Sequence, residues 1–331
     1  MSYKCGCYAY LNLYLEKYGY HFRYFNHSQF LQDYQQMLSE KYNNDEINEI
    51  SQQIKALQDS KKQEDSKAYE RLQHIRKLYK PLHKNIYTFD ECFLENSFKS
   101  LVAACKKGDR DLIDATRYPN EEVKVFTFRV FTKDFINLFL EEINHISNYD
   151  GIVLGRPNSM NHNGVLMKEL GMDEMLTVLR EEYLQPIVDT VFSDTIGECE
   201  SHRGFTVKYS FDGTVFDGSG DKQLGKHYDN AEVTLNVCMQ ADQVQGSNLV
   251  FMGMANDEDC DRERIHLEHE VGMGILHLGQ LKHYVTPIEQ GIRTNLVLWL
   301  RSSAVRNKVC PMCWDSPEIV ATKCMDDGFR P

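Results

Sequence analysis

The sequence has no run of about 18 consecutive apolar residues, the minimum for a transmembrane helix. Its first residues, Met1 to Cys7, lack the apolar stretch of a secretory signal. It also lacks positive charge in excess, because the 331 residues carry a net charge of −12. We therefore expect no membrane segment, no nucleic-acid partner and an intracellular protein whose compartment stays open.

Cysteine is not scarce, but the setting that favours disulfides is missing. Ten cysteines without a secretory signal are more typical of free thiols or metal ligands than of a disulfide framework. Cys310 and Cys313 have the spacing of half a zinc site, which Cys5, Cys7 or Cys324 would have to complete. An unmetallated pair of thiols is the simpler interpretation.

Glycine is absent from residues 31–85, and Pro81 is the only proline there. The stripe Ile47, Ile50, Ile54 and Leu57 predicts an amphipathic helix. The polar stretch 59–66 should break it before a second stripe that begins at Tyr69, which gives a helical hairpin or pair. Residues 1–30 are rich in Tyr and Phe and should pack against a larger body. Together, residues 1–118 form an expected N-terminal accessory region.

Strand patterns dominate the later chain. Two amphipathic helices, near 133–146 and 176–191, precede short alternating runs that end with the apolar run 294–300. This order predicts a mainly β fold with flanking helices, namely a double-stranded β-helix, or jelly roll. We expect this domain at 119–305, with its core at 200–303, and a cysteine-containing tail at 306–331.

His227 and Asp229 lead directly into the alternating strand 233–237. In an extended segment, residues i and i+2 project to the same face. An imidazole and a carboxylate side by side make two thirds of the 2-His-1-carboxylate triad that binds Fe(II) in non-haem oxygenases. His266, His269, His277 and His283 are the candidates for the second histidine.

Arg293 stands before the apolar run 294–300 and should be buried. A buried guanidinium needs an anionic partner, since an unpaired charge in the interior is costly. A ligand carboxylate is the simplest partner, because the planar fork binds it in two places. The residues thus indicate a metal next to a carboxylate clamp.

His227-x-Asp229, His283 and Arg293, with the segment His-Tyr-Asp-Asn-Ala-Glu-Val-Thr-Leu-Asn-Val at 227–237, resemble the prolyl and lysyl hydroxylase type of 2-oxoglutarate- and iron-dependent oxygenase. Three further segments resemble one subfamily of these enzymes: 155–161, 201–203 and 299–313. The resemblance runs from about residue 120 to 315, and more faintly to the N-terminus.

The resemblance implies a ligand set and a reaction. His227, Asp229 and His283 would hold Fe(II), and Arg293 would bind 2-oxoglutarate, which Tyr209 and Asn236 would also contact. O2 would be the oxidant and ascorbate the reductant. The enzyme would hydroxylate a prolyl or lysyl side chain of a protein or peptide substrate and release succinate and CO2.

Two other functions fit part of the pattern. A jelly-roll scaffold could hold a metal at the triad without turnover, although a degenerate site usually loses one of these residues. A zinc hydrolase would share the three-ligand logic. It would give no reason for Arg293 at the start of a buried strand.

Overall fold

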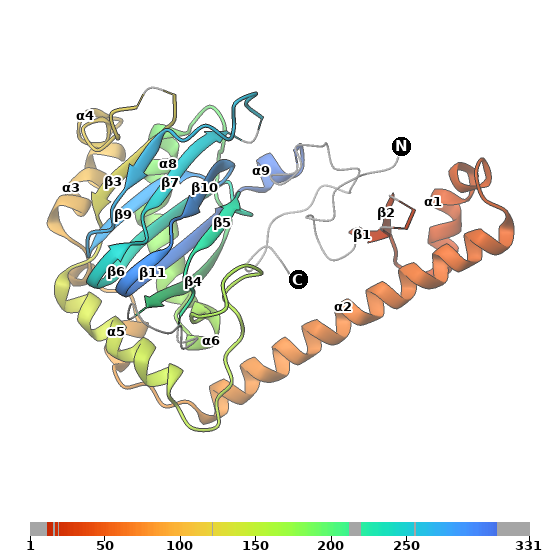
Figure 1. The fold of residues 1–331 in the computed structure, drawn as a ribbon, viewed down its shortest axis with the longest axis horizontal. Coiled ribbons are helices and arrows are strands. Elements are labelled where there is room, and N and C mark those ends of the chain that lie inside the picture. The colour runs from red at the N-terminus through yellow and green to blue at the C-terminus, as the bar shows by residue number, and fades with distance from the viewer. Residues whose placement is uncertain are drawn as a thin grey trace.

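The computed structural model describes residues 12–15, 17–18, 20–120, 122–211, 220–254 and 256–309. Its main body is a pair of antiparallel sheets with helices on one side, and a long helix leads away to a small N-terminal module (Figure 1). None of the helices in this part of the chain combines the length and the apolar character needed to cross a lipid bilayer.

The larger sheet has the order β3-β9-β6-β11-β4, and the smaller has the order β5-β10-β7-β8. From β4 to β11 the chain alternates between the two sheets, except that β7 and β8 pair with each other in the smaller one, and this crossing between two sheets is the connectivity of a jelly roll. This confirms the predicted fold class. The strands of the larger sheet are β3 Val125–Arg129, β4 Ser201–Phe211, β6 Val233–Gly246, β9 Met273–Leu278 and β11 Ile288–Arg301. Those of the smaller sheet are β5 Leu224–His227, β7 Leu249–Met254, β8 Ile265–Leu267 and β10 Leu281–Val285.

Alternating side chains of the larger sheet fill two separate cores. Phe205, Val207 and Trp299 point toward the smaller sheet and pack with Leu249 and Phe251. Their neighbours along the strands point to the other face and meet the helices. A sheet buried on both faces explains why β11 is apolar without interruption over 296–300.

The helices that cover the outer face bury mainly phenylalanine and aliphatic side chains. Their bounds are α3 Asn96–Cys105, α4 Asp111–Asp114, α5 Lys133–Ser147, α6 Met167–Leu170, α7 Asp173–Val178, the π-helical turn η3 Leu179–Leu184, α8 Gln185–Val191 and α9 Ser303–Arg306. Two 3-10 turns precede them, η1 Lys84–Tyr87 and η2 Glu91–Phe93. Thr132 is the N-cap of α5, since its hydroxyl accepts from the Phe135 amide at 3.4 Å.

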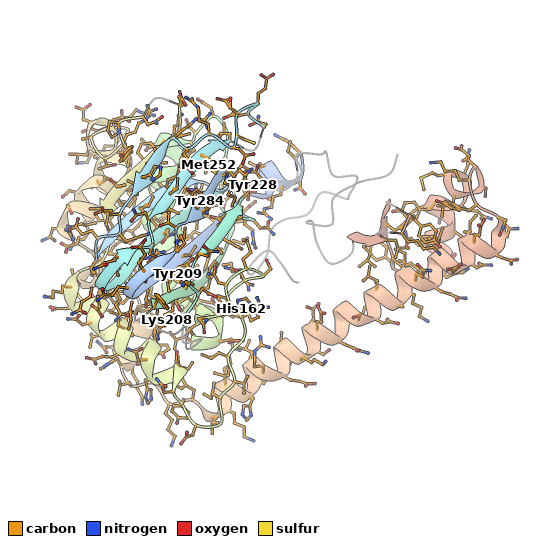
Figure 2. The ribbon with its side chains drawn as sticks, in the orientation of Figure 1. His162, Lys208, Tyr209, Tyr228, Met252 and Tyr284 are labelled. Atoms are coloured by element: carbon orange, nitrogen blue, oxygen red, sulfur yellow. The ribbon has the colours of Figure 1, made fainter. Side chains whose placement is uncertain are left out.

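The N-terminal module consists of β1 Asn12–Leu15, β2 Tyr20–Arg23 and α1 His27–Ser39, packed on the start of α2 Asn44–Leu78. It has its own small core around Phe22 and Phe30 and stands apart from the jelly roll (Figure 1). Most residues in the middle of α2 are exposed, and their side chains extend away from both bodies (Figure 2).

The predicted helical pair is wrong, because α2 is one helix of 35 residues. The stretch 59–66 is polar, but it contains no Gly or Pro, and Lys, Gln and Glu favour helix. Lys62 Nζ donates to Gln58 Oε1 at 3.2 Å across one turn. A capping box at Asn43 and Glu46 fixes the start of the helix.

The far end of α2 is fixed to the jelly roll by Glu142 of α5, which is fully buried. Its carboxylate accepts from the hydroxyls of Tyr79 at 2.5 Å and Tyr87 at 2.6 Å, and from the backbone amides of Leu82 and His83. Four donors satisfy both oxygens, as a buried carboxylate requires.

One strand boundary differs from expectation. β11 begins at Ile288, so Arg293 lies within the strand and not at its start. His283 lies in β10. The cysteines proposed for zinc, at positions 5, 7, 310, 313 and 324, lie outside the described residues. The proposed domain boundaries stay predictions.

Replacing Glu142 with Gln should lower the free energy of unfolding by about 1–3 kcal/mol, because an amide nitrogen would face hydrogen-bond donors. Denaturant unfolding measures this. The exposed neighbour Glu141, which pairs only with His83, is the control, and Glu141→Gln should change little. The hydrogen bonds from Tyr79 and Tyr87 outweigh burial and lower the pKa of Glu142. Its contribution is therefore complete above the unfolded Glu pKa and lost as the pH falls below it. Equal effects of the two substitutions would contradict this role.

Candidate active site

The two sheets bring His227 and His283 together. His227 is the last residue of β5, and the strand register pairs it directly with His283 of β10. Their ring centroids lie 4.2 Å apart. Cross-strand partners share one face of a sheet, so both imidazoles project into the space between the sheets.

Each of these rings has its Nδ1 bound to a backbone carbonyl and its Nε2 turned toward Asp229. The Nδ1 atoms donate to the carbonyl oxygens of Gly225 and Leu281, both at 2.8 Å. A carbonyl can only accept, so each proton lies on Nδ1 and each Nε2 presents its lone pair. Backbone partners that select the tautomer in this way are typical of histidines that bind metal.

Asp229 completes the group from the segment that joins β5 to β6. Its Oδ2 accepts from the Thr234 hydroxyl at 2.7 Å. Its Oδ1 lies 3.5 Å from His227 Nε2 and 3.7 Å from His283 Nε2. Taken over all three residues, the potential ligand atoms lie within 4.8 Å of one another, within reach of a single ion.

Burial affects the pKa of both Asp229 and His283. Burial would raise the pKa of Asp229, but His283 and His227 together hold it below its usual value. Burial, with His227 beside it, lowers the pKa of His283 to about 3. The group therefore offers a carboxylate and a neutral imidazole, which are the ionisation states that bind a cation.

A pocket of about 770 Å³ opens over the triad, and Arg293, Tyr209 and Asn236 also line it. Its middle is apolar, formed by residues such as Phe205, Val297 and Leu249. Because a small dicarboxylate occupies far less volume, the pocket has room for such a molecule together with part of a second one.

Arg293 is 1% exposed and lies with its Cζ 4.4 Å from the ring centre of Tyr209. Nε donates to Ser247 Oγ at 3.0 Å, and Nη1 donates to His269 Nε2 at 2.7 Å and to Asn295 Oδ1 at 3.1 Å. Nη2 is buried and has no hydrogen-bond partner among the described residues. An unsatisfied buried donor at the wall of a pocket indicates a place for an acceptor.

Tyr209 and Asn236 stand on either side of Arg293. The Tyr209 hydroxyl accepts from Asn161 Nδ2 at 3.2 Å, and burial raises the pKa of this tyrosine. The Asn236 amide oxygen accepts from Asn295 Nδ2 at 2.5 Å. Figure 2 shows Tyr209 among the strands, whereas Tyr228, which also lines the pocket, lies toward their edge.

The other candidate histidines lie elsewhere. His277 is buried in β9 and packs beside His283, with ring centroids 5.0 Å apart and its Nδ1 on the Leu278 carbonyl. His266 is exposed and pairs with Glu263. His269 contacts Arg293 and not the triad.

Several residues of the site were not predicted from the sequence. Asn295 stands two positions after Arg293 on the same strand face, so alternation alone could have indicated it. Thr234 lies on the polar face of β6 but carried no sign of its contact with Asp229. Ser247 and His269 come from connections whose course the sequence does not reveal.

Comparisons with known proteins identify the family of this chain. Residues 75–197 match the model of the OGFOD2-like domain family. 2-Oxoglutarate and iron-dependent oxygenase domain-containing protein 2 of Danio rerio is 38% identical over 99% of this chain and 94% of its own length. The Homo sapiens protein of the same name is 36% identical over 98% of this chain and 93% of its own length.

Among solved structures, a prolyl-4-hydroxylase of Pseudomonas putida is 13% identical, with a TM-score of 0.37 over 63% of this chain and 97% of its own. The non-haem α-ketoglutarate-dependent epimerase SnoN is 12% identical, with a TM-score of 0.43, over 69% of this chain and 95% of its own. The near-complete matches to the curated sequences decide the assignment: the chain belongs to the family of 2-oxoglutarate and iron-dependent oxygenase domain-containing protein 2.

Proposed function

We propose that the protein is an Fe(II)- and 2-oxoglutarate-dependent dioxygenase that hydroxylates a side chain of a protein or peptide. One observation carries the proposal: a single pocket is lined both by the triad and by a buried arginine with an unsatisfied nitrogen. The triad suits a divalent cation, and the arginine suits a carboxylate that lies at a distance from this cation.

The donor set fits Fe(II). Two neutral imidazoles and one carboxylate are the ligands that non-haem iron prefers, and three protein ligands leave positions open. His227, Asp229 and His283 would hold the metal, while Thr234 and the carbonyls of Gly225 and Leu281 would keep them oriented. When bound, iron with 2-oxoglutarate and O2 supplies the oxidising chemistry, in which 2-oxoglutarate becomes succinate and CO2.

The other residues would bind and orient the co-substrate. Arg293 would take its distal carboxylate at Nη2, and Tyr209 and Asn236 would contact its chain. The apolar middle of the pocket would keep water away from the reacting atoms. We also propose ascorbate as a reductant that maintains the iron.

Of the two expected side chains, the pocket favours proline over lysine. Besides Arg293, its lining includes the cationic residues Arg156, Arg203, Lys226 and Lys282. The one carboxylate among its described lining residues is Asp229, which the metal would engage. Asp261 pairs with both Lys226 and Lys282, but the four cations outnumber it, so a lysine substrate would meet an excess of like charge that a neutral ring would not.

Asp229→Ala should abolish formation of the complex of the protein with Fe(II) and 2-oxoglutarate. Anaerobic addition of Fe(II) and then 2-oxoglutarate to the purified protein should give a visible charge-transfer band, which the variant should lose because one of three ligands is gone. If the unaltered protein gives no band but binds zinc tightly, the scaffold or hydrolase function would be favoured instead.

Arg293→Ala should weaken 2-oxoglutarate binding by about tenfold to a hundredfold, since a charge-assisted hydrogen bond contributes about 1.5–3 kcal/mol. Iron affinity should stay unchanged, because Arg293 does not contact the triad. Titration with 2-oxoglutarate, followed by the charge-transfer band, measures the affinity for 2-oxoglutarate. Binding of Fe(II) in the absence of 2-oxoglutarate measures the affinity for iron. Unchanged 2-oxoglutarate affinity would refute the clamp.

Two peptide sets that differ only in a central proline or lysine test the substrate side chain. We expect stimulation of 2-oxoglutarate turnover and a gain of one oxygen mass with proline peptides, and little with lysine peptides. If positive charge around the pocket causes the preference, replacing Lys226 and Lys282 with Gln should reduce the difference in turnover between proline and lysine peptides. A preference for lysine in the unaltered enzyme would contradict the charge argument.

A further inference from the structure

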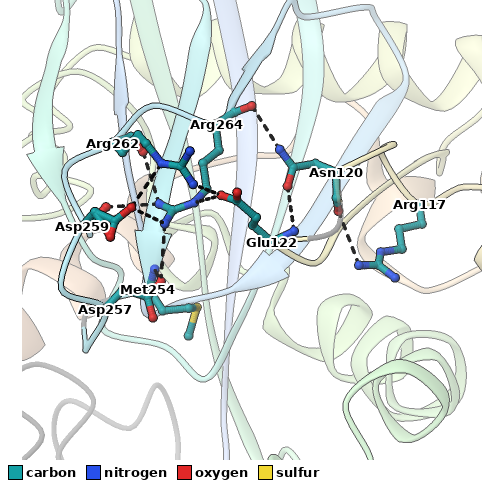
Figure 3. Close-up of polar contacts among 8 residues, drawn as sticks. All are labelled: Arg117, Asn120, Glu122, Met254, Asp257, Asp259, Arg262 and Arg264. Atoms are coloured by element: carbon teal, nitrogen blue, oxygen red, sulfur yellow. Dashed lines mark hydrogen bonds and ion pairs between the residues drawn. The ribbon is translucent and has the colours of Figure 1, made fainter.

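Two arginines with buried side chains outside the pocket lining are paired with carboxylates. Arg264, whose side chain is 7% exposed, lies 2.6 Å from Glu122 and within 4 Å of Asp257 and Asp259 (Figure 3). Arg306 Nε lies 2.9 Å from Glu232 Oε2, and both side chains are almost fully buried. Such ion pairs satisfy the guanidinium and cancel its charge.

Arg293 is buried as deeply, but its surroundings differ. Its three contacting acceptors, Ser247 Oγ, His269 Nε2 and Asn295 Oδ1, are all uncharged, and no Asp or Glu of the described chain forms an ion pair with it. Its Nη2 is left without an acceptor there. The guanidinium is thus oriented on one side and keeps its full positive charge.

His269 is the least expected of these acceptors, because it could itself carry a positive charge. It lies in the connection between β8 and β9, and its Nε2 is 2.7 Å from Arg293 Nη1. A guanidinium can only donate, and the Asn295 amide nitrogen, 3.2 Å from His269 Nδ1, is also a donor, so a protonated ring would face donors at both nitrogens. The ring is therefore neutral, and the shorter contact with the charged guanidinium places its lone pair at Nε2. Burial and the charge of Arg293 lower the pKa of His269 well below its usual value, which agrees with a neutral ring.

Ser247 shows that the fold maintains this arrangement under strain. Its backbone has φ of 57°, the left-handed region that residues other than glycine seldom adopt. Its amide is held by the Pro287 carbonyl at 3.0 Å, and its hydroxyl then accepts from Arg293 Nε. A strained residue that persists beside an unpaired charge indicates a functional constraint.

We propose that His269 is a positioning residue for co-substrate binding: as a neutral acceptor it fixes the direction of Arg293 without cancelling its charge, which is kept for the distal carboxylate of 2-oxoglutarate. The proposal rests on the proposed function, since it takes the anion to be 2-oxoglutarate. A carboxylate at this position would stabilise the ligand-free protein better but would compete with the ligand.

Two substitutions that differ only in charge test this role. Gln and Glu both reach about as far as histidine, and each offers an oxygen to Nη1. His269→Gln keeps a neutral acceptor, whereas His269→Glu introduces an anion beside Arg293. The measurements are 2-oxoglutarate affinity of the iron-loaded protein without oxygen, iron affinity, and the thermal midpoint of the ligand-free protein.

We expect His269→Gln to bind 2-oxoglutarate within a few-fold of the unaltered protein and His269→Glu to bind it about tenfold or more weakly, as one charge-assisted bond implies. The ligand-free His269→Glu protein should unfold at the same temperature as His269→Gln or higher. Iron affinity should not change. General damage to the fold would instead lower stability and affinity together.

Two results would overturn the proposal. If both variants weaken 2-oxoglutarate binding equally while the unaltered protein binds it, charge at position 269 is irrelevant and only this inference fails. If the unaltered protein itself binds no 2-oxoglutarate, the proposed function fails, and the inference fails with it. Binding by the unaltered protein separates the two cases.

Discussion

The antiparallel pairing of β6 with β11 is the constraint on which the rest of the site depends. β6 continues from Asp229 and carries Thr234 and Asn236, and β11 carries Arg293 and Asn295. Their register places Asn236 opposite Val297 and Ala241 opposite Arg293, with one irregularity between them at Thr294 and Asn295. Backbone hydrogen bonds of this pair therefore set the distance from Arg293 to Thr234, which holds Asp229 of the proposed metal-binding triad.

The smaller sheet contributes what β6 and β11 cannot. It supplies both histidines as cross-strand partners, while the turn from β5 into β6 brings Asp229 to meet them. The triad thus sits where the chain passes from one sheet to the other. The packing of the two sheets around their apolar core also brings the three proposed ligands together. A change that separates the sheets would therefore also separate these ligands.

The sequence predicted the jelly roll and three candidate site residues from local signals. His227 and Asp229 are two apart in an extended segment, and Arg293 adjoins a long apolar run. His283 was one of four candidate histidines and was selected only through the family resemblance. What failed had two different causes, one local and one that depends on a contact distant in the chain. The polar stretch 59–66 was expected to break a helix, but nothing in it opposes helix and solvent satisfies its side chains. His269 was considered only as a metal ligand, because its partner Arg293 lies 24 residues away.

The continuity of α2 has a geometric consequence for the module at its far end. A helix of 35 residues is about 52 Å long and turns by about 100° with each residue. Removing one residue from its solvated middle would shift the N-terminal module by only about 1.5 Å but would point it in another direction. Removing seven would nearly restore the direction and bring the module about 10 Å closer. A change in the length of this connection therefore keeps the direction of the module only in steps close to whole turns.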